Sequence, residues 1–159
     1  MKIAVLVKQV PSSETTLPIL GNHNWIDEEQ VSFVMNPPDN FAIEEALLIK
    51  ERAGDGEVVI VSMGPTRVQK VIREGLAKGA DRGIQLEEDG QIQTDPLSIA
   101  KSISSILRDE NFDFVIANPP YFNRAQSSPA PHQARERALG EQTPLKIWVK
   151  LAAKRLRPK

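Results

Sequence analysis

Apolar residues gather in short runs along the chain, separated by longer stretches in which apolar and polar positions mix. Runs of this length, rich in Val and Ile, are typical of strands buried in a parallel sheet. Three strong runs cover residues 2–8, 57–62 and 112–117, and a weaker one covers residues 83–86. We therefore predict four main parallel strands.

The stretches between these runs carry helix signals. Asp39 can cap a helix with a broad apolar face, and Gly54 can end it. Pro65 and Pro96 are start signals for helices over residues 66–78 and 97–108. Alternating strands and helices predict an α/β fold, a Rossmann-like three-layer sandwich with right-handed crossovers and strand order 3-2-1-4.

One segment departs from this alternation. Residues 17–20 and 31–34 read as two short strands separated by a turn that includes Gly21 and Asn22. We therefore expect an antiparallel β-hairpin near residues 17–34, inserted after the first strand.

Length and composition narrow the class of protein. The 159 residues suit a single α/β domain, and the absence of cysteine together with only two histidines argues against a metal site. No apolar run is long enough to span a membrane, and the first residues lack a signal-peptide profile. We expect a cytoplasmic protein with no membrane partner. The sequence leaves its oligomeric state open.

Charge is distributed unevenly along the chain. From Arg124 onward there are nine lysines and arginines against two acidic residues, and the body before it is acidic. A basic tail can bind RNA, but it can also be the solvated face of a helix. Residues 144–156 favour the second reading, because the apolar positions Leu145, Trp148 and Val149 recur at helical spacing. RNA binding is therefore not expected.

Open parallel sheets bind ligands at the carboxyl ends of their strands, so the residues there are the candidates for chemistry. The glycine-rich fingerprints of dinucleotide and phosphate loops are absent from the sequence. In their place, the first strand is followed by residues 8–13 without glycine, and the second ends in Ser62-Met-Gly-Pro65.

Several motifs in residues 1–114 resemble the β subunit of the electron transfer flavoproteins in order and spacing. They are Lys2-Ile-Ala-Val-Leu-Val-Lys-Gln-Val10, Met35-Asn-Pro37, Ala42-Ile-Glu-Glu-Ala-Leu47, Val61-Ser-Met-Gly-Pro65, Gly79-Ala-Asp-Arg82 and Asp95-Pro-Leu97. Pro38 and Asn40 depart from the aromatic and acidic residues common in that family.

In that family the β subunit holds AMP, and flavin is bound mainly by the α subunit. The resemblance implies an adenosine pocket lined by Leu6, Asn36 and Met63, with Asp39 and Gly64 close by. An Asn amide offers a donor and an acceptor to adenine or ribose, and a glycine lets the backbone approach a ligand. The structural alternative is that Asn36 and Pro37 only form a turn before a helix capped by Asp39.

Residues 112–159 resemble a different family, the tRNA (valine) adenine-N6 methyltransferases. Their signature here is the box Asn118, Pro119, Pro120 and Tyr121. In adenine-N6 transfer Asn118 and the Pro119 carbonyl would accept hydrogen bonds from the exocyclic amine, and Tyr121 would stack on the flipped base.

We therefore predict an engineered chimera of these two families, joined near Asp113, with a flavoprotein-like part over residues 1–114 and a methyltransferase-like part over 115–159. It would have no catalytic residues, only a vestigial acceptor box, and no enzymatic activity. It would bind AMP weakly or take no cofactor, and a flavoprotein α subunit is not expected to bind. The alternatives are an S-adenosylmethionine-dependent adenine-N6 methyltransferase and a basic RNA-binding module.

Overall fold

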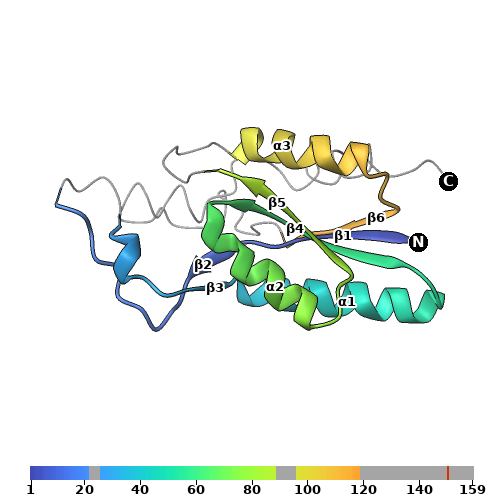
Figure 1. Cartoon of the computed structure of the whole chain (residues 1–159), viewed down its shortest axis with the longest axis horizontal. Coiled ribbons are helices and arrows are strands. Elements are labelled where there is room, and N and C mark those ends of the chain that lie inside the picture. The colour runs from blue at the N-terminus through green and yellow to red at the C-terminus, as the bar shows by residue number, and fades with distance from the viewer. Residues whose placement is uncertain (22–25, 89–95, 119–149, 151–159) are drawn as a thin grey trace, which may run out of the picture.

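A four-stranded parallel sheet forms the centre of the protein (Figure 1). The computed structural model describes residues 1–21, 26–88, 96–118 and 150. Its parallel strands are β1 (Lys2–Leu6), β4 (Glu57–Gly64), β5 (Arg82–Glu87) and β6 (Phe114–Ile116). They lie in the order β5-β4-β1-β6, which reads 3-2-1-4 when these four strands alone are counted along the chain. The predicted α/β fold is confirmed.

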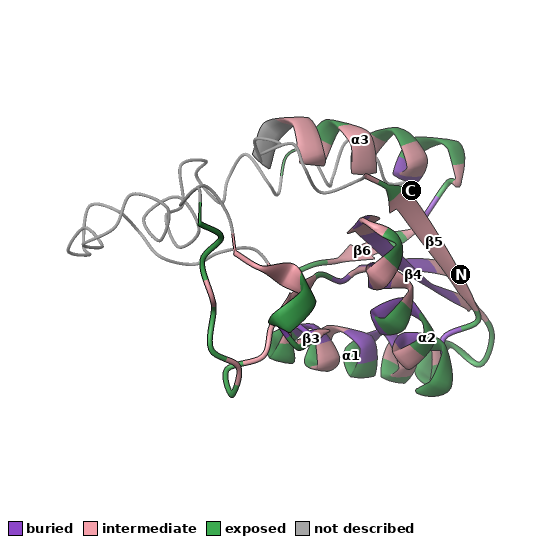
Figure 2. Cartoon of the chain, turned by 60° about the vertical axis from the view of Figure 1, so that its left-hand side comes forward, coloured by how far each residue is buried: buried purple, intermediate pink, exposed green. Residues whose placement is uncertain are grey.

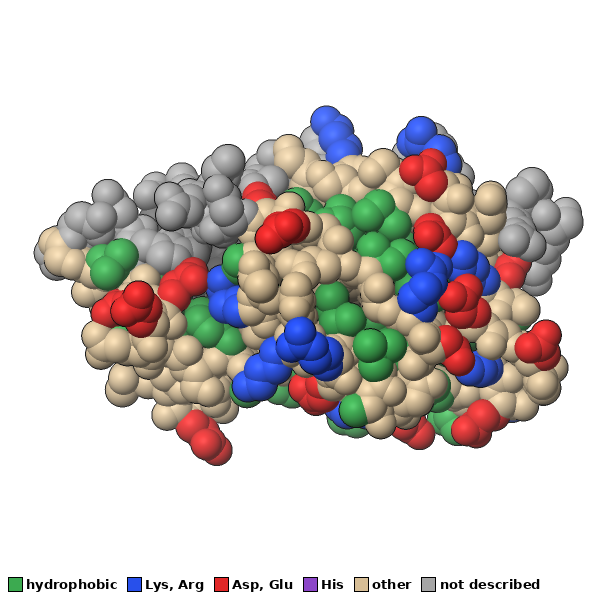
Figure 3. Space-filling view, viewed as in Figure 1, with side chains coloured by type: hydrophobic (Ala, Val, Ile, Leu, Met, Phe, Trp, Pro, Cys, Tyr) green, Lys and Arg blue, Asp and Glu red, His purple; other side chains and the backbone are tan. Residues whose placement is uncertain are grey.

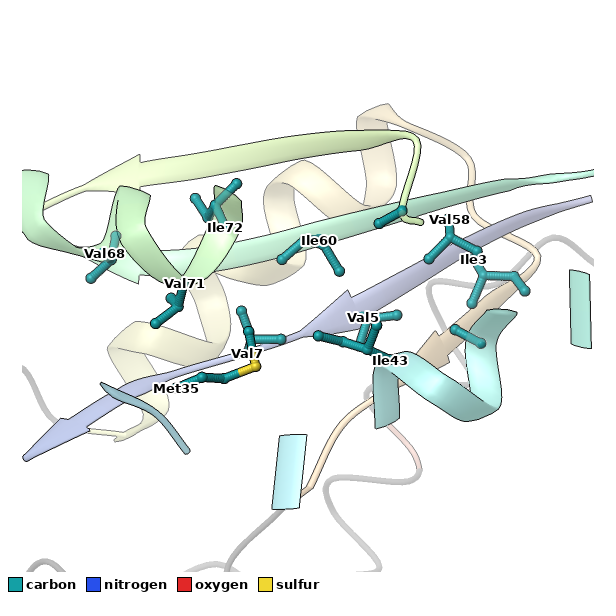
Figure 4. Close-up of a cluster of buried hydrophobic side chains, with 12 residues drawn as sticks. Ile3, Val5, Val7, Met35, Ile43, Val58, Ile60, Val68, Val71 and Ile72 are labelled. Atoms are coloured by element: carbon teal, nitrogen blue, oxygen red, sulfur yellow. The ribbon is translucent and has the colours of Figure 1, made fainter. Parts of the chain in front are cut away.

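Helices cover both faces of the sheet and define two apolar layers (Figures 1 and 2). On one face lie α1 (Pro37–Ala53) and α2 (Gln69–Ala77), and on the other lies α3 (Pro96–Asp109). Side chains alternate between the faces along each strand. Thus Val5 and Ile60 pack in the α1 and α2 layer, drawn in Figure 4, whereas Ala4 and Val61 pack with Phe112 under α3.

The helix boundaries differ in detail from those predicted. Asp39 does not cap α1, because Asn36 occupies the N-cap position and two prolines fill the first helical positions. Asp39 lies one residue further on, at the third helical position, where its carboxylate is buried. Gly54 does end α1, in a left-handed conformation with φ of 76°. The predicted helix 66–78 begins as a 3-10 turn, η2 (Thr66–Val68), before α2.

The inserted hairpin follows the first strand as predicted, and its second arm overlaps the predicted strand over residues 31–34, whereas its first arm lies earlier in the chain than predicted. Its arms are β2 (Gln9–Pro11) and β3 (Phe33–Met35), paired antiparallel, with a 3-10 turn η1 (Glu28–Gln30) before β3. Within residues 17–34, the described part of the connection contains one antiparallel bridge, between Ile19 and Ile26. Leu17 and Ile19 are 50% and 64% exposed, so their run has no buried face to hold it as a strand. Met35, 3% exposed, instead anchors β3 in the core.

Charged side chains close the amino edge of the sheet. Glu110 accepts hydrogen bonds of 2.5 Å from both Lys2 on β1 and Arg82 on β5, and Arg82 also reaches Glu57 on β4 at 3.0 Å. These hydrogen bonds from Arg82 and Lys2 lower the pKa of Glu110 to about 2. The network ties three neighbouring strands to the end of α3.

Two aspartates complete this edge by accepting hydrogen bonds from strand amides. The Asp81 carboxylate binds the N–H of Val58 at 2.7 Å, and the Asp113 carboxylate binds the N–H of Lys2 at 2.7 Å. The Asp113 N–H in turn donates to the Lys2 carbonyl at 2.8 Å. The region around Asp113 is therefore joined to the first strand in both directions.

Several predictions fall wholly or partly outside the described residues. These include the tail helix over residues 144–156 and the box residues Pro119, Pro120 and Tyr121. Lys150 is described, and it is helical and exposed as predicted. A single domain over residues 1–159 stays a prediction. Across the described ranges, no helix has the length and apolar character needed to cross a membrane.

Candidate functional site

The carboxyl ends of β1 and β4 lie side by side and carry the candidate residues. Leu6 is paired with Val61, and the Val7 N–H donates to the Val61 carbonyl at 2.9 Å, so the two strands reach this edge together. Met63 and Gly64 extend β4 beyond this point. The structure thus brings the ends of both predicted segments to one edge.

Asp39 organises the chain where it leaves β1. One carboxylate oxygen accepts the Lys8 N–H at 2.8 Å, and the other accepts the side-chain amide of Asn36 at 2.8 Å. Backbone bonds reinforce the arrangement, since the Asn36 N–H donates to the Lys8 carbonyl at 2.9 Å. Asp39 therefore holds Asn36 in a fixed rotamer and ties the start of α1 to the end of β1.

The Asp39 carboxyl is 2% exposed, and burial raises its pKa above the ordinary value. The hydrogen bonds from Lys8 and Asn36 and the charge of Lys8 oppose this rise without cancelling it. A buried carboxyl with two amide donors is costly to ionise yet well oriented. It is suited to positioning a neighbouring group.

Gly64 ends β4 with a φ of 149°, a conformation that L side chains rarely adopt. A Cβ there would lie 2.8 Å from Cγ1 of the buried Val68. The Gln85 side chain donates to the Gly64 and Pro65 carbonyls at 3.2 and 3.3 Å, which fixes this turn from β5. Glycine is therefore required here by both conformation and space.

The predicted site residues approach the edge from two faces of the sheet. Leu6 packs against the apolar cluster under α3, whereas Asn36 and Asp39 belong to the start of α1 on the opposite face. Hydrogen bonds join Asn36, Asp39 and Lys8 into one unit. Leu6, Met63 and Gly64 do not belong to this hydrogen-bonded unit; they lie at the carboxyl ends of β1 and β4. Asn118 is partly buried shortly after β6, the strand on the other side of β1.

Sequence reasoning missed two features of this edge. The Lys8 backbone N–H donates a hydrogen bond to the Asp39 carboxylate, and a backbone group gives no signal in the sequence. Ser62 is 1% exposed, and its hydroxyl has no hydrogen-bond partner among the residues that the structure describes. A serine that ends an otherwise apolar run was the available sign of Ser62, because such a residue must bury a hydroxyl.

Residues 24–119 match the electron transfer flavoprotein domain, which is more than half of the chain. The chain belongs to the electron transfer flavoprotein family. Relatives in this family are named as one subunit of an assembly.

An electron transfer flavoprotein subunit beta from Bradyrhizobium diazoefficiens is 38% identical over 73% of this chain and 46% of its own length. Its counterpart in Arabidopsis thaliana, named mitochondrial, is 40% identical over 70% of this chain and 43% of the relative. The Homo sapiens subunit beta is 32% identical over 73% and 46%. The chain spans about half the length of the curated relatives that it matches.

These relationships correct the predicted function. The family match runs through residue 119, past the junction placed near Asp113, and the relatives that cover most of the chain are flavoprotein β subunits. The engineered chimera without activity, and the methyltransferase and RNA-binding alternatives, are therefore wrong.

The prediction about the α subunit is also wrong, because proteins named subunit beta belong to an assembly with another subunit. The absence of enzymatic activity and a cytoplasmic location stay predictions. The Arabidopsis relative is mitochondrial by name, so the family occupies more than one compartment.

Proposed function

We propose that this chain is the nucleotide-holding part of an electron transfer flavoprotein β subunit and binds an adenine nucleotide, AMP, at the carboxyl edge of β1 and β4. The observation that carries this proposal is the Asn36–Asp39 pair. Asp39 takes one N–H of the Asn36 amide, and this fixes where the remaining N–H and the amide oxygen are presented. A preoriented amide suits the donor and acceptor pattern of adenine or ribose.

The rest of the edge fits a nucleoside. Gly64 has no Cβ at the end of β4, so a ligand can approach its backbone closely. Leu6 and Met63 add partly buried apolar surface from neighbouring strands. Ser62, two residues before Gly64, has a buried hydroxyl with no hydrogen-bond partner among the described residues. Because this hydroxyl lies within the core, we assign it no contact with the ligand.

The relatives support a role in electron transfer. The relatives are named flavoproteins, and in this proposal the described residues contribute the adenine-nucleotide site. In this proposal the chain's own residues hold the nucleotide and present a folded surface to an α subunit. Participation in electron transfer is proposed for this chain by analogy with its relatives, which are about twice as long.

Calorimetry with AMP tests the nucleotide site. Asn36→Ala is expected to weaken AMP binding by about tenfold or more, because it removes the proposed hydrogen bonds between the Asn36 amide and the nucleotide. Asn40→Ala is the matched control, since Asn40 lies on the same helix and bonds Lys78 and the Pro37 carbonyl instead. Equal AMP affinity in both variants would contradict the site.

Size-exclusion chromatography with a purified electron transfer flavoprotein α subunit tests the assembly. The expected result is co-elution of the two chains, with more flavin retained by the mixture than by the α subunit alone. Separate elution at micromolar concentrations of both chains, with AMP present, would contradict the proposed partner while leaving the AMP measurement intact.

A further inference from the structure

A pocket lies between the β2–β3 hairpin and the start of α2, and its lining includes none of the residues assigned to the proposed nucleotide edge. It is open to solvent and has a volume of about 570 Å³. That size is in the range of small-molecule sites. Val31 and Phe33 supply apolar wall from the hairpin side, and η2 and α2 supply most of the polar wall.

The pocket is rich in cations. Arg67, Lys70 and Arg73 line it, against one carboxylate, Glu28. Glu28 pairs with Arg67 at 3.0 Å. Lys70 donates to the Phe33 carbonyl at 3.2 Å and Arg73 to the Gln69 side chain at 2.8 Å, and within the described ranges neither forms an ion pair. Figure 3 shows Lys and Arg side chains over the first half of α2 and beside the hairpin. Two cations are thus held by neutral oxygens.

Unsatisfied polar atoms occur at the same place. Over the described residues, three buried side-chain atoms have no hydrogen-bond partner, and two of them, Gln9 Oε1 and Arg67 Nε, belong to side chains that line this pocket. Both side chains are held in position. The Gln9 amide nitrogen donates to the Arg67 carbonyl at 3.1 Å, and the Arg67 guanidinium carbon lies 4.3 Å from the centroid of the Phe33 ring. Buried polar groups without partners are rare and call for an explanation.

One ligand chemistry answers both observations. Neither unsatisfied atom is exposed, but both side chains are only half-buried, so each can turn toward a ligand in the pocket. An anionic group then satisfies Arg67 Nε and the two cations on α2, and a hydroxyl or amine donor satisfies Gln9 Oε1. We propose that this pocket binds a small hydroxylated organic anion, of the hydroxycarboxylate or hydroxyalkyl phosphate class, through Gln9, Arg67, Lys70 and Arg73. The site goes beyond the proposed nucleotide function and shares none of its residues.

Two tricarboxylates separate the parts of this proposal. Citrate carries a hydroxyl, and tricarballylate is the same molecule without it. Calorimetry on the full chain at low ionic strength is expected to show citrate binding about tenfold more tightly than tricarballylate, because only citrate offers Gln9 a donor. Glycerol phosphate against inorganic phosphate makes the same comparison for the phosphate source.

The double variant Lys70→Gln with Arg73→Gln is expected to weaken citrate binding by about tenfold or more. Both side chains are exposed, so the fold should survive. Lys78→Gln is the control, because Lys78 lies just after α2 and outside the pocket. Equal loss in the control would show general charge attraction and overturn the site. No binding of citrate or glycerol phosphate by the wild-type chain would also overturn it.

A cross-test keeps this site apart from the nucleotide edge. The double variant should bind AMP like the wild type, and Asn36→Ala should bind citrate like the wild type. Loss of citrate binding in Asn36→Ala would overturn the assignment to this pocket. Failure of AMP to bind at all would instead contradict the proposed function alone.

Discussion

The two edges of the parallel sheet are built on opposite principles. At the amino edge, Glu110 gathers Lys2 and Arg82, and the carboxylates of Asp81 and Asp113 satisfy strand amides. At the carboxyl edge the Ser62 hydroxyl is buried without a partner among the described residues, and burial of the Asp39 carboxyl opposes its ionisation. The first edge satisfies its polar groups within the chain, whereas the second buries polar groups at a cost in free energy. Such concentrated local cost is typical of a functional edge.

Glu110 and Asp39 express this difference in their protonation. Hydrogen bonds from Arg82 and Lys2 lower the pKa of Glu110 to about 2, so its ionised form is preferred by the folded state. Burial raises the pKa of Asp39, so the folded state favours the protonated carboxyl more than the unfolded state does. Acid therefore removes stability at the amino edge and relieves a cost at the carboxyl edge.

The largest effect is expected at Gly64. Gly64→Ala must adopt a φ of 149° and place Cβ 2.8 Å from Val68 Cγ1, so we expect a loss of about 3 kcal/mol in unfolding free energy. Gly54→Ala is the control, because it also has positive φ, 76°, but nothing within 4 Å of the added Cβ. It should lose about 1 kcal/mol. Urea unfolding measures both, and equal losses would show that crowding at this edge is unimportant.

Removing the buried Asp39 carboxyl should lower the free energy of unfolding slightly less than Gly64→Ala does. Asp39→Ala leaves the Lys8 N–H and the Asn36 amide without their acceptor, and a loss of about 2 kcal/mol is expected at pH 7. Part of the lost bonding is offset because the ionised carboxylate no longer has to be buried. Asp55→Ala, at an exposed position after α1, should be close to neutral. A stability above wild type for Asp39→Ala would mean that ionisation, not bonding, dominates at this site.

At the amino edge, Glu110→Gln is expected to lose about 1 kcal/mol at pH 7 after solvent screening. The Glu110 contribution is present above the unfolded pKa of 4.5 and is lost as pH falls toward about 2. Wild type and variant should therefore converge in stability over that interval. Thermal unfolding across this pH range measures the convergence, with exposed Glu44→Gln as control. Parallel curves would remove Glu110 from the explanation.

The smallest effect has the opposite sign. Ser62→Ala removes a buried hydroxyl that forms no hydrogen bond within the described part of the chain, and a gain of about 0.5 kcal/mol is expected. Ser105→Ala, which gives up an exposed bond to the Ser102 carbonyl, should change stability little. A clear loss on Ser62→Ala in denaturant titrations would reveal a partner for the hydroxyl and make the carboxyl edge as satisfied as the amino edge.

Local patterns in the sequence predicted the fold because they are repeated in many residues. The apolar runs of β1 and β4, and the start and stop signals at Pro65 and Gly54, each report burial or backbone geometry directly. The first arm of the hairpin was misplaced because Leu17 and Ile19 look like strand residues but are exposed. Their apolar character alone does not say which face they bury.

The site was predicted in part. Asn36, Asp39 and Gly64 were placed at the right edge, but Asp39 was given a capping role because its sequence position suits a cap. Its true partners are a backbone amide and a side chain, a pairing that only the folded chain creates. The chimera was predicted because the box over residues 118–121 was taken as the mark of a second family, whereas the match to the flavoprotein domain runs through residue 119. Short boxes specify less than the ordered motifs that precede them.

The central position of β1 has a consequence for how the chain acquires its structure during synthesis. β1 leaves the ribosome first, yet its neighbours are β4 and β6, and the bond between Lys2 and Asp113 closes a span of 111 residues. Until β4 emerges, the backbone hydrogen-bonding groups on both sides of β1 are unpaired, and those on one side stay unpaired until β6 follows. We therefore expect this apolar strand to stay exposed early in translation, and pausing the ribosome between β4 and β6 should leave a protease-sensitive, half-formed sheet.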